Sequence, residues 1–161
     1  PTHSYSSAAS DVYKRQGDNK LMNGYIDNNG AEPKITIDIL GLPSSFTGPG
    51  YNVVAYIGSD GNGRTGTIGI DGAATYSYST FSQQGADFPN AYQITTDTGA
   101  GNPDANYAVW TGLSGADIKL SLDRGSNNSG IHGIQVIAIP EPSAGLFLGA
   151  SSLLFFLRRR R

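Results

Sequence analysis

Apolar residues alternate with polar ones over short stretches of this chain, and turn-forming residues separate the stretches. Over residues 35–39, isoleucines alternate with Thr36 and Asp38, which predicts a half-buried strand with its isoleucines on the core side. Residues 118–123 repeat the pattern, with Ile and Leu set against Lys, Ser and Asp. Residues 51–57 (YNVVAYI) are almost continuously apolar, which predicts a central strand that is covered on both faces or has an aromatic rim on one. The periodicity therefore predicts a β protein.

Glycine-rich turns set the order of the remaining strands. The string GSDGNG at 58–63 leads into residues 65–70, which we expect to be the returning strand of a hairpin. Asp71-Gly72 is a tight-turn signal that leads into a strand at 74–81. Further strands are expected at 91–95, 106–113 and 131–138, which gives about eight in all. The predicted fold class is all-β, a jelly-roll-like antiparallel β-sandwich.

Composition supports this class and excludes several kinds of function. With 161 residues, the chain has room for one ordinary domain and a tail. Its 22 glycines and 9 tyrosines fit a turn-rich β protein better than a helical one. The formal net charge is -2 although four arginines occupy the last four positions, so the body is acidic and offers no footprint for nucleic acid. Without cysteine there is no disulfide, thiolate metal ligand or cysteine nucleophile.

We expect three segments along the chain: a non-native or disordered leader at 1–16, a β-sandwich domain at 17–139 and a terminal signal at 140–161. The chain begins with Pro1 and shows no apolar signal-peptide core, so we expect the native start and its export signal to lie upstream. Residues 6–16 (SSAASDVYKRQ) resemble translated adaptor sequence and are not part of the predicted fold.

The terminal segment has three parts in a fixed order. Pro140-Glu141-Pro142 comes first, mostly apolar or small residues follow over 143–157, and Arg158, Arg159, Arg160 and Arg161 end the chain. We expect residues 143–157 to form a short transmembrane helix. Because a helix rises about 1.5 Å per residue, it would reach less than the roughly 30 Å of a hydrocarbon core. The arginines favour the cytoplasmic side and leave the β domain outside. A core helix or a plain tail anchor is the alternative interpretation of this length.

These three parts together resemble the PEP-CTERM sorting signal of bacterial exosortase substrates. The resemblance covers residues 140–161 and implies a partner, a membrane-embedded exosortase that acts as a cysteine protease or transpeptidase. This partner would recognise Pro140-Glu141-Pro142 and cut near it, so that the chain is the substrate of the reaction. The implied localisation is transient anchoring in the inner membrane with a cytoplasmic C-terminus, followed by the cell surface or the extracellular space.

A second resemblance concerns the body. Residues 58–66 (GSDGNGRTG), 100–113 (AGNPDANYAVWTGL) and 124–137 (RGSNNSGIHGIQVI) look like segments that recur in exported PEP-CTERM proteins of polysaccharide-rich bacterial groups. Such domains are similar to galactose-binding-like β-sandwiches. The resemblance implies a fold and a location outside the cell, and it implies no activity.

Two small groups of residues are candidate ligand contacts. Asp60, Asn62 and Arg64 lie in a glycine-rich loop with a superficial likeness to a calcium loop, but the distal bidentate Glu of an EF-hand is missing, so a tight turn is favoured. Trp110 and Tyr107, with the other tyrosines, offer faces that suit the C–H patches of a sugar. Alternation puts these two side chains on opposite faces of the strand but does not say which face contacts solvent. A core position is favoured for Trp110.

No catalytic constellation is visible in the sequence. His132 alternates with apolar residues, which favours a structural role, and no Ser/His/Asp or metal site can be assembled around it. The aspartates offer no motif that selects a pair of carboxylates for glycoside hydrolysis. We expect a non-catalytic exported surface or extracellular-matrix protein with no cofactor other than a candidate calcium ion, and with extracellular polysaccharide as a candidate partner. The alternatives are an ancillary fragment of a polysaccharide-active hydrolase and a purely structural spacer.

Overall fold

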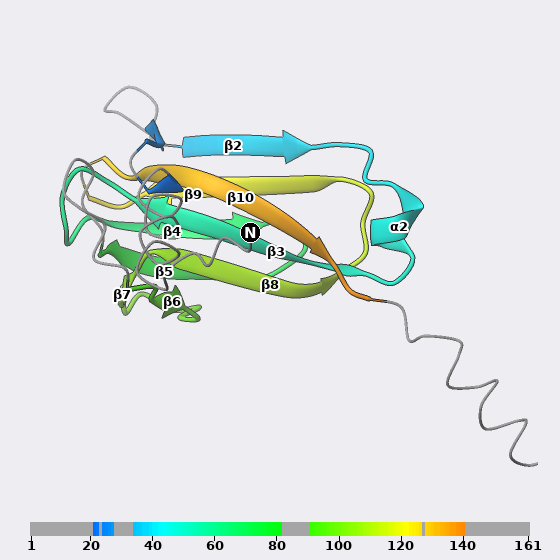
Figure 1. The fold of residues 1–161 in the computed structure, drawn as a ribbon. Coiled ribbons are helices and arrows are strands. Elements are labelled where there is room, and N and C mark those ends of the chain that lie inside the picture. The colour runs from blue at the N-terminus through cyan, green and yellow to red at the C-terminus, as the bar shows by residue number, and fades with distance from the viewer. Residues whose placement is uncertain (1–20, 23, 28–33, 82–90, 127, 141–161) are drawn as a thin grey trace, which may run out of the picture.

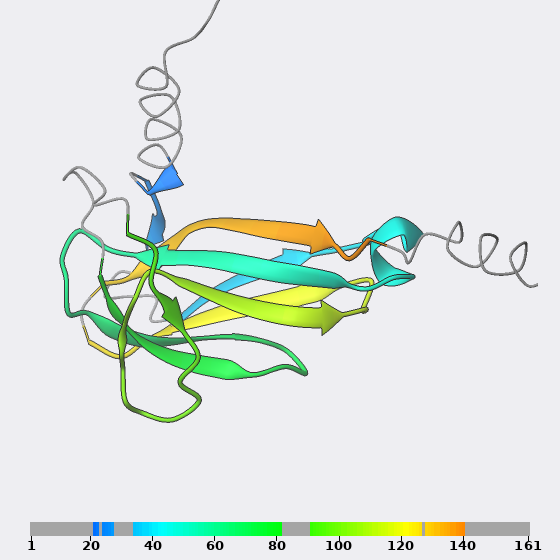
Figure 2. The same cartoon turned by 60° about the horizontal axis from the view of Figure 1, so that its bottom comes forward.

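Two β-sheets stacked face to face make up the domain (Figures 1 and 2). The computed structural model describes residues 21–22, 24–27, 34–81, 91–126 and 128–140. The first sheet has, in spatial order, β1 (Ile26–Asp27), β10 (Gly130–Ala138), β3 (Tyr51–Gly58), β8 (Tyr107–Leu113) and β6 (Ile94–Thr95). The second has β2 (Lys34–Ile39), β9 (Ile118–Arg124), β4 (Thr65–Ile70), β5 (Thr75–Thr80) and β7 (Asp104–Ala105). The predicted all-β sandwich is confirmed.

The core lies between the sheets and is built from alternate residues of each strand. In β3, the inward side chains of Tyr51, Val53 and Ile57 are no more than 1% exposed, whereas the outward side chains of Val54 and Tyr56 are half-buried. β3 lies between β10 and β8, so it is the predicted central strand, and it has the aromatic rim on its outer face. Apolar burial of this kind is the main stabilising contribution to the fold.

The alternating pattern of residues 35–39 and 118–123 also gives the observed arrangement. β2 and β9 pair in antiparallel register, with Ile37 opposite Leu120, and both side chains belong to the core or pack against it. Charged residues of the same strands point outward, where the Lys34 ammonium lies 3.4 Å from the Asp123 carboxylate. A period of two in the sequence was therefore sufficient to identify the buried face of these strands.

The predicted hairpin between residues 51–57 and 65–70 is wrong. β3 belongs to the first sheet and β4 to the second, so the loop at 58–64 carries the chain across the sandwich. Inward apolar side chains of the two strands, such as Ile57 and Ile68, belong to the same core cluster. The tight turn at Asp71-Gly72 is confirmed: it joins β4 to β5, with Gly72 at φ 78° and the Ala73 N–H donating to the Ile70 carbonyl at 2.9 Å.

Edge segments differ from the expected antiparallel pattern. The strand expected at 91–95 is reduced to β6, while β1 and β7 were not predicted. β6 pairs with β8, and β7 with β5, in parallel register. Residues 96–103 lie between these edges and bond to β5, since the N–H groups of Ser77 and Ser79 donate to the carbonyls of Asp97 and Pro103. Side-chain periodicity does not carry this information, because the pairing depends on backbone groups.

Helical structure is small in the part of the chain that the structure describes. α2 (Ser44–Thr47) is a four-residue turn after β2, where no helix was expected. No helix among the described residues is long and apolar enough to cross a membrane. The predicted transmembrane helix at 143–157, the rest of the terminal signal from Glu141 onward and the predicted leader at 1–16 lie outside the described residues.

Candidate functional site

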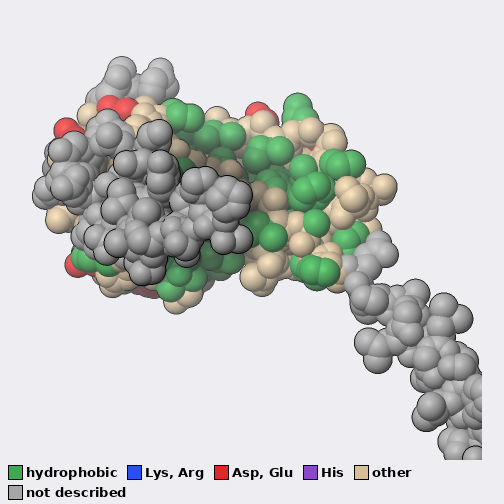
Figure 3. Space-filling view, viewed as in Figure 1, with side chains coloured by type: hydrophobic (Ala, Val, Ile, Leu, Met, Phe, Trp, Pro, Cys, Tyr) green, Lys and Arg blue, Asp and Glu red, His purple; other side chains and the backbone are tan. Residues whose placement is uncertain are grey.

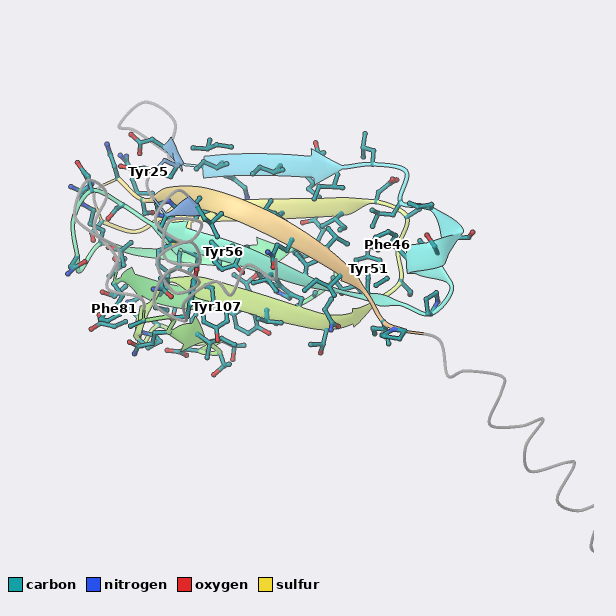
Figure 4. The ribbon with its side chains drawn as sticks, viewed as in Figure 1. Tyr25, Phe46, Tyr51, Tyr56, Phe81 and Tyr107 are labelled. Carbon is teal, nitrogen blue, oxygen red and sulfur yellow. The ribbon has the colours of Figure 1, made fainter. Side chains whose placement is uncertain are left out.

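Three tyrosines meet on the outer face of the first sheet. Tyr56 of β3 and Tyr107 of β8 are directly paired in the sheet register, and Tyr92 precedes β6, the strand next to β8. The ring centroids of Tyr56 and Tyr92 lie 5.8 Å apart, those of Tyr92 and Tyr107 6.1 Å, and those of Tyr56 and Tyr107 6.4 Å. Figure 4 labels Tyr56 and Tyr107 on their neighbouring strands. These spacings are those of favourable aromatic pairs, so the rings hold one another in place.

The tyrosines belong to a larger surface that we call the outer face. Its members are the outward residues of the three long strands and of the β6 edge. They are Asn52, Val54, Tyr56, Tyr92, Ile94, Tyr107, Val109, Thr111, Gly133, Gln135 and Ile137. Tyr92, Ile94 and Ile137 are 41%, 42% and 47% exposed. Figure 3 shows hydrophobic side chains gathered on the part of this face that is not drawn in grey.

Charge distinguishes the two outer surfaces of the sandwich. No residue of the outer face as defined above carries a charge, and its polar groups are amides and hydroxyls, such as the Tyr56 hydroxyl that donates to Gln135 Oε1 at 3.3 Å. On the second sheet, β2 and β9 present Lys34, Asp38, Lys119 and Asp123 outward. A ligand on the first sheet would therefore meet rings, methyl groups and neutral hydrogen-bonding groups.

Trp110 lies on the opposite side of β8 from Tyr107, as the alternation predicted, and its side is the core. It is 3% exposed, its indole Nε1–H donates to the Ala74 carbonyl at 2.7 Å, and its ring lies 5.5 Å from that of Tyr76. The indole is therefore not available to stack on a sugar, and of the two aromatic candidates only Tyr107 reaches the surface.

The loop at 58–64 is held by its own contacts. Arg64 pairs with the Asp60 carboxylate and donates from Nη1 to the Asn128 carbonyl at 2.9 Å. Thr80 Oγ1 donates to the Gly61 carbonyl at 2.7 Å and accepts from the Arg64 N–H at 3.1 Å. Asn62 is exposed at the tip. The Asp60 carboxylate already has a cationic partner, and the described residues contain no group of three or more metal-ligating side chains. The loop acts as a fixed connection between the sheets.

His132 sits at the junction of β1 and β10. Its Nδ1 lies 3.0 Å from the Gly24 carbonyl, to which Nδ1–H donates, and its ring meets that of Tyr25 edge-on at 5.5 Å. Nε2 is buried and has no hydrogen-bond partner among the described residues. Burial lowers the pKa of His132, which favours the neutral ring. A cavity of about 370 Å³ beside it is lined mainly by apolar side chains such as Ile26, Ile37 and Ile134. This arrangement fits the structural role that the sequence favoured.

The sequence pointed to the tyrosines as a class but selected only Tyr107. Tyr56 falls on the outer side of an apolar run, and Tyr92 lies in a predicted strand of which only residues 94–95 pair in the structure. Neither tyrosine therefore has a local signal that separates it from a core residue. Their meeting depends on β3, β8 and β6 being neighbours in one sheet. No protein-family model, no curated protein and no solved structure matches this chain.

Proposed function

We propose that the chain is an exported, non-catalytic surface or extracellular-matrix module that an exosortase-type membrane protease or transpeptidase sorts through its C-terminal signal. The observation that carries the proposal is the three-part order of that signal: Pro140-Glu141-Pro142, the apolar stretch 143–157 and the arginines 158–161. In this proposal residues 143–157 form the short transmembrane helix, and the arginines keep the C-terminus in the cytoplasm. The body is a jelly-roll-like domain of the galactose-binding-like type.

The position of the motif relative to the domain supports the proposal. β10, the last strand, ends at Ala138. One further backbone bond, from the Ile139 N–H to the Gly50 carbonyl at 2.9 Å, fixes the chain before the exposed Pro140. β10 itself is held between β1 and β3. Cleavage at or after Pro140 would therefore remove no strand from the sandwich, and the released domain would keep its core.

Extracellular polysaccharide is the partner that the outer face favours. Its tyrosines combine apolar rings with hydroxyl groups, as a sugar-binding surface requires. A structural spacer would have no use for such a face.

The sorting function is tested by following the tail in a host that carries an exosortase and in the same host without it. The full chain would be expressed behind an added export signal and an N-terminal tag, and the mature C-terminus would be determined by mass spectrometry. We expect residues 143–161 to be lost only where the exosortase is present. A tail that remains in both hosts would make this a simple membrane-anchored β domain and overturn the proposal.

Two variants separate motif recognition from membrane insertion. Replacing Pro140 and Pro142 by Ala should abolish processing while leaving the protein in the membrane fraction. Changing all four terminal arginines to Lys keeps the positive charge that orients the helix and is the matched control for topology. If the alanine variant were processed as efficiently as the parent, Pro-Glu-Pro would not be the recognition element.

A further inference from the structure

We propose that the outer face of the first sheet binds an uncharged polysaccharide, whose sugar rings pack on the tyrosines Tyr92 and Tyr107. This inference rests on the proposed function, and it narrows the extracellular partner to one chemical class and one surface.

Ring exposure and mutual support make these tyrosines suitable. Tyr92 is 41% exposed and Tyr107 is half-buried, so part of each side chain faces solvent. Tyr92 meets Tyr56 and Tyr107 at interplanar angles of 61° and 87°, and Tyr56 is tied to Gln135 by its hydroxyl. Because these contacts already restrict the rings, a ligand would lose little side-chain entropy by ordering them further.

The uncharged character of the face selects the class of polysaccharide. A uronate or sulfate group placed here would lose hydration without meeting a cation among the residues of the outer face, which is unfavourable. Two cations of the described residues form ion pairs elsewhere: Arg64 pairs with Asp60 in the loop at 58–64, and Lys34 pairs with Asp123 on the second sheet. Amide and hydroxyl groups, such as those of Gln135 and Thr111, match the hydroxyl groups of a neutral sugar.

The dimensions of the face favour a chain of linked sugars over a single one. In one row across the strands, Gly133, Tyr56, Tyr107 and Ile94 are consecutive register partners. Three strand spacings of about 4.8 Å make this row roughly 14 Å long. Leu21 lies over Gly133, where an added side chain would meet its Cδ1, and so bounds the row on the β10 side. The row continues past Tyr107 to the exposed Ile94 at the β6 edge.

Affinity electrophoresis of the full chain tests the inference without any need for an exosortase. The protein would be kept in a polyoxyethylene detergent, because a detergent with a sugar headgroup would compete. Native gels would contain a neutral α-glucan, β-glucan, mannan, galactan or xylan, or acidic alginate as the charged counterpart. We expect retardation by at least one neutral polymer, no retardation by alginate, and little change between low and high salt, since no ion pair is involved.

Variants of the face locate the binding. Tyr92→Ala and Tyr107→Ala should each weaken retardation by up to about tenfold, because each removes one aromatic contact. Tyr92→Phe keeps the ring and should retain most of the binding. Leu40→Ala is the matched control, since Leu40 is 73% exposed but lies outside the outer face. Circular dichroism spectra that match the parent would show that the variants are folded.

Three results would overturn the inference. One is the absence of retardation by every neutral polymer, and another is retardation that both alanine variants retain. The third is a dimer in sedimentation velocity that Tyr107→Ala converts to a monomer, which would assign the face to a second copy of the chain. Each of these results is independent of tail processing, so a failure here and a failure of the sorting proposal can be told apart.

Discussion

Trp110 provides the strongest test of the core. Its indole is 3% exposed, donates to the Ala74 carbonyl at 2.7 Å and packs against Tyr76 at a centroid distance of 5.5 Å. Trp110→Ala removes the ring, the hydrogen bond and the aromatic contact together. Trp110→Phe keeps an aromatic ring and removes the indole N–H.

The two substitutions should differ in size. Truncation of a buried Trp to Ala costs about 3–5 kcal/mol of unfolding free energy, a large part of the roughly 5–15 kcal/mol of a typical domain. For Trp110→Phe, the lost hydrogen bond contributes about 1 kcal/mol, and the smaller ring adds to that, so we expect about 1–2 kcal/mol. The midpoint of thermal unfolding should fall by roughly 10–20 °C for the Ala variant and by about 5 °C for the Phe variant.

Urea unfolding followed by far-ultraviolet circular dichroism measures these differences. Fluorescence is unsuitable, because Trp110 is the single tryptophan of the chain and both variants lose it. Equal slopes of free energy against urea would show that the variants unfold from comparable states. Leu40→Ala, at a residue 73% exposed, should change stability by no more than about 0.5 kcal/mol.

If Trp110→Ala lowered the unfolding free energy by less than about 1 kcal/mol, the placement of this ring in the core would be refuted, because truncating a buried tryptophan costs about 3–5 kcal/mol. Loss of polysaccharide binding by the Phe variant with its stability unchanged would lead to the same conclusion. It would place Trp110 on the binding surface.

Further predictions concern a buried base, a turn and a surface ion pair. Because burial lowers the pKa of His132 in the folded state, the unfolded chain binds the proton more readily. The contribution of the neutral His132 ring to the free energy of unfolding should therefore be fully present above the ordinary pKa of about 6.5. It should fall as the pH drops below that value, with a limiting slope of about 1.4 kcal/mol per pH unit. His132→Asn keeps a donor for the Gly24 carbonyl and should remove this dependence below about pH 6.5 in urea titrations; an unchanged slope would exclude His132 as its source. Gly72→Ala should cost about 1–2 kcal/mol in thermal unfolding, because φ is 78° at this turn, whereas Gly24→Ala, where an added Cβ meets nothing within 4 Å, should be nearly neutral; equal losses would argue against the turn geometry. Lys34→Ala should change the unfolding free energy by no more than about 0.5 kcal/mol, since the Lys34 and Asp123 side chains are 52% and 51% exposed, and a loss above about 1 kcal/mol would contradict this.

Local patterns predicted the strands and their buried sides well where one face is apolar and the other charged. In residues 118–123 all charged and hydroxyl side chains lie on one side of the strand, and Leu120 and Leu122 on the other side are fully buried as expected. The turn at Asp71-Gly72 was equally visible, because its backbone geometry demands a residue that tolerates positive φ. The sequence predicted the buried side of a strand less well where both sides are uncharged. In residues 106–111 it separated Tyr107 from Trp110 but did not say which faces solvent.

The sequence by itself determined the all-β class, the inward side of the alternating strands and the order of Pro-Glu-Pro, apolar stretch and arginines over residues 140–161, because each depends on residues that are close along the chain. Only the tertiary structure decided that β3 and β4 lie in different sheets, that Trp110 is internal, and that Tyr56, Tyr92 and Tyr107 meet on one surface. These outcomes depend on which strands become neighbours. That choice is made by packing the whole core at once, and the period of any single strand is compatible with several partners.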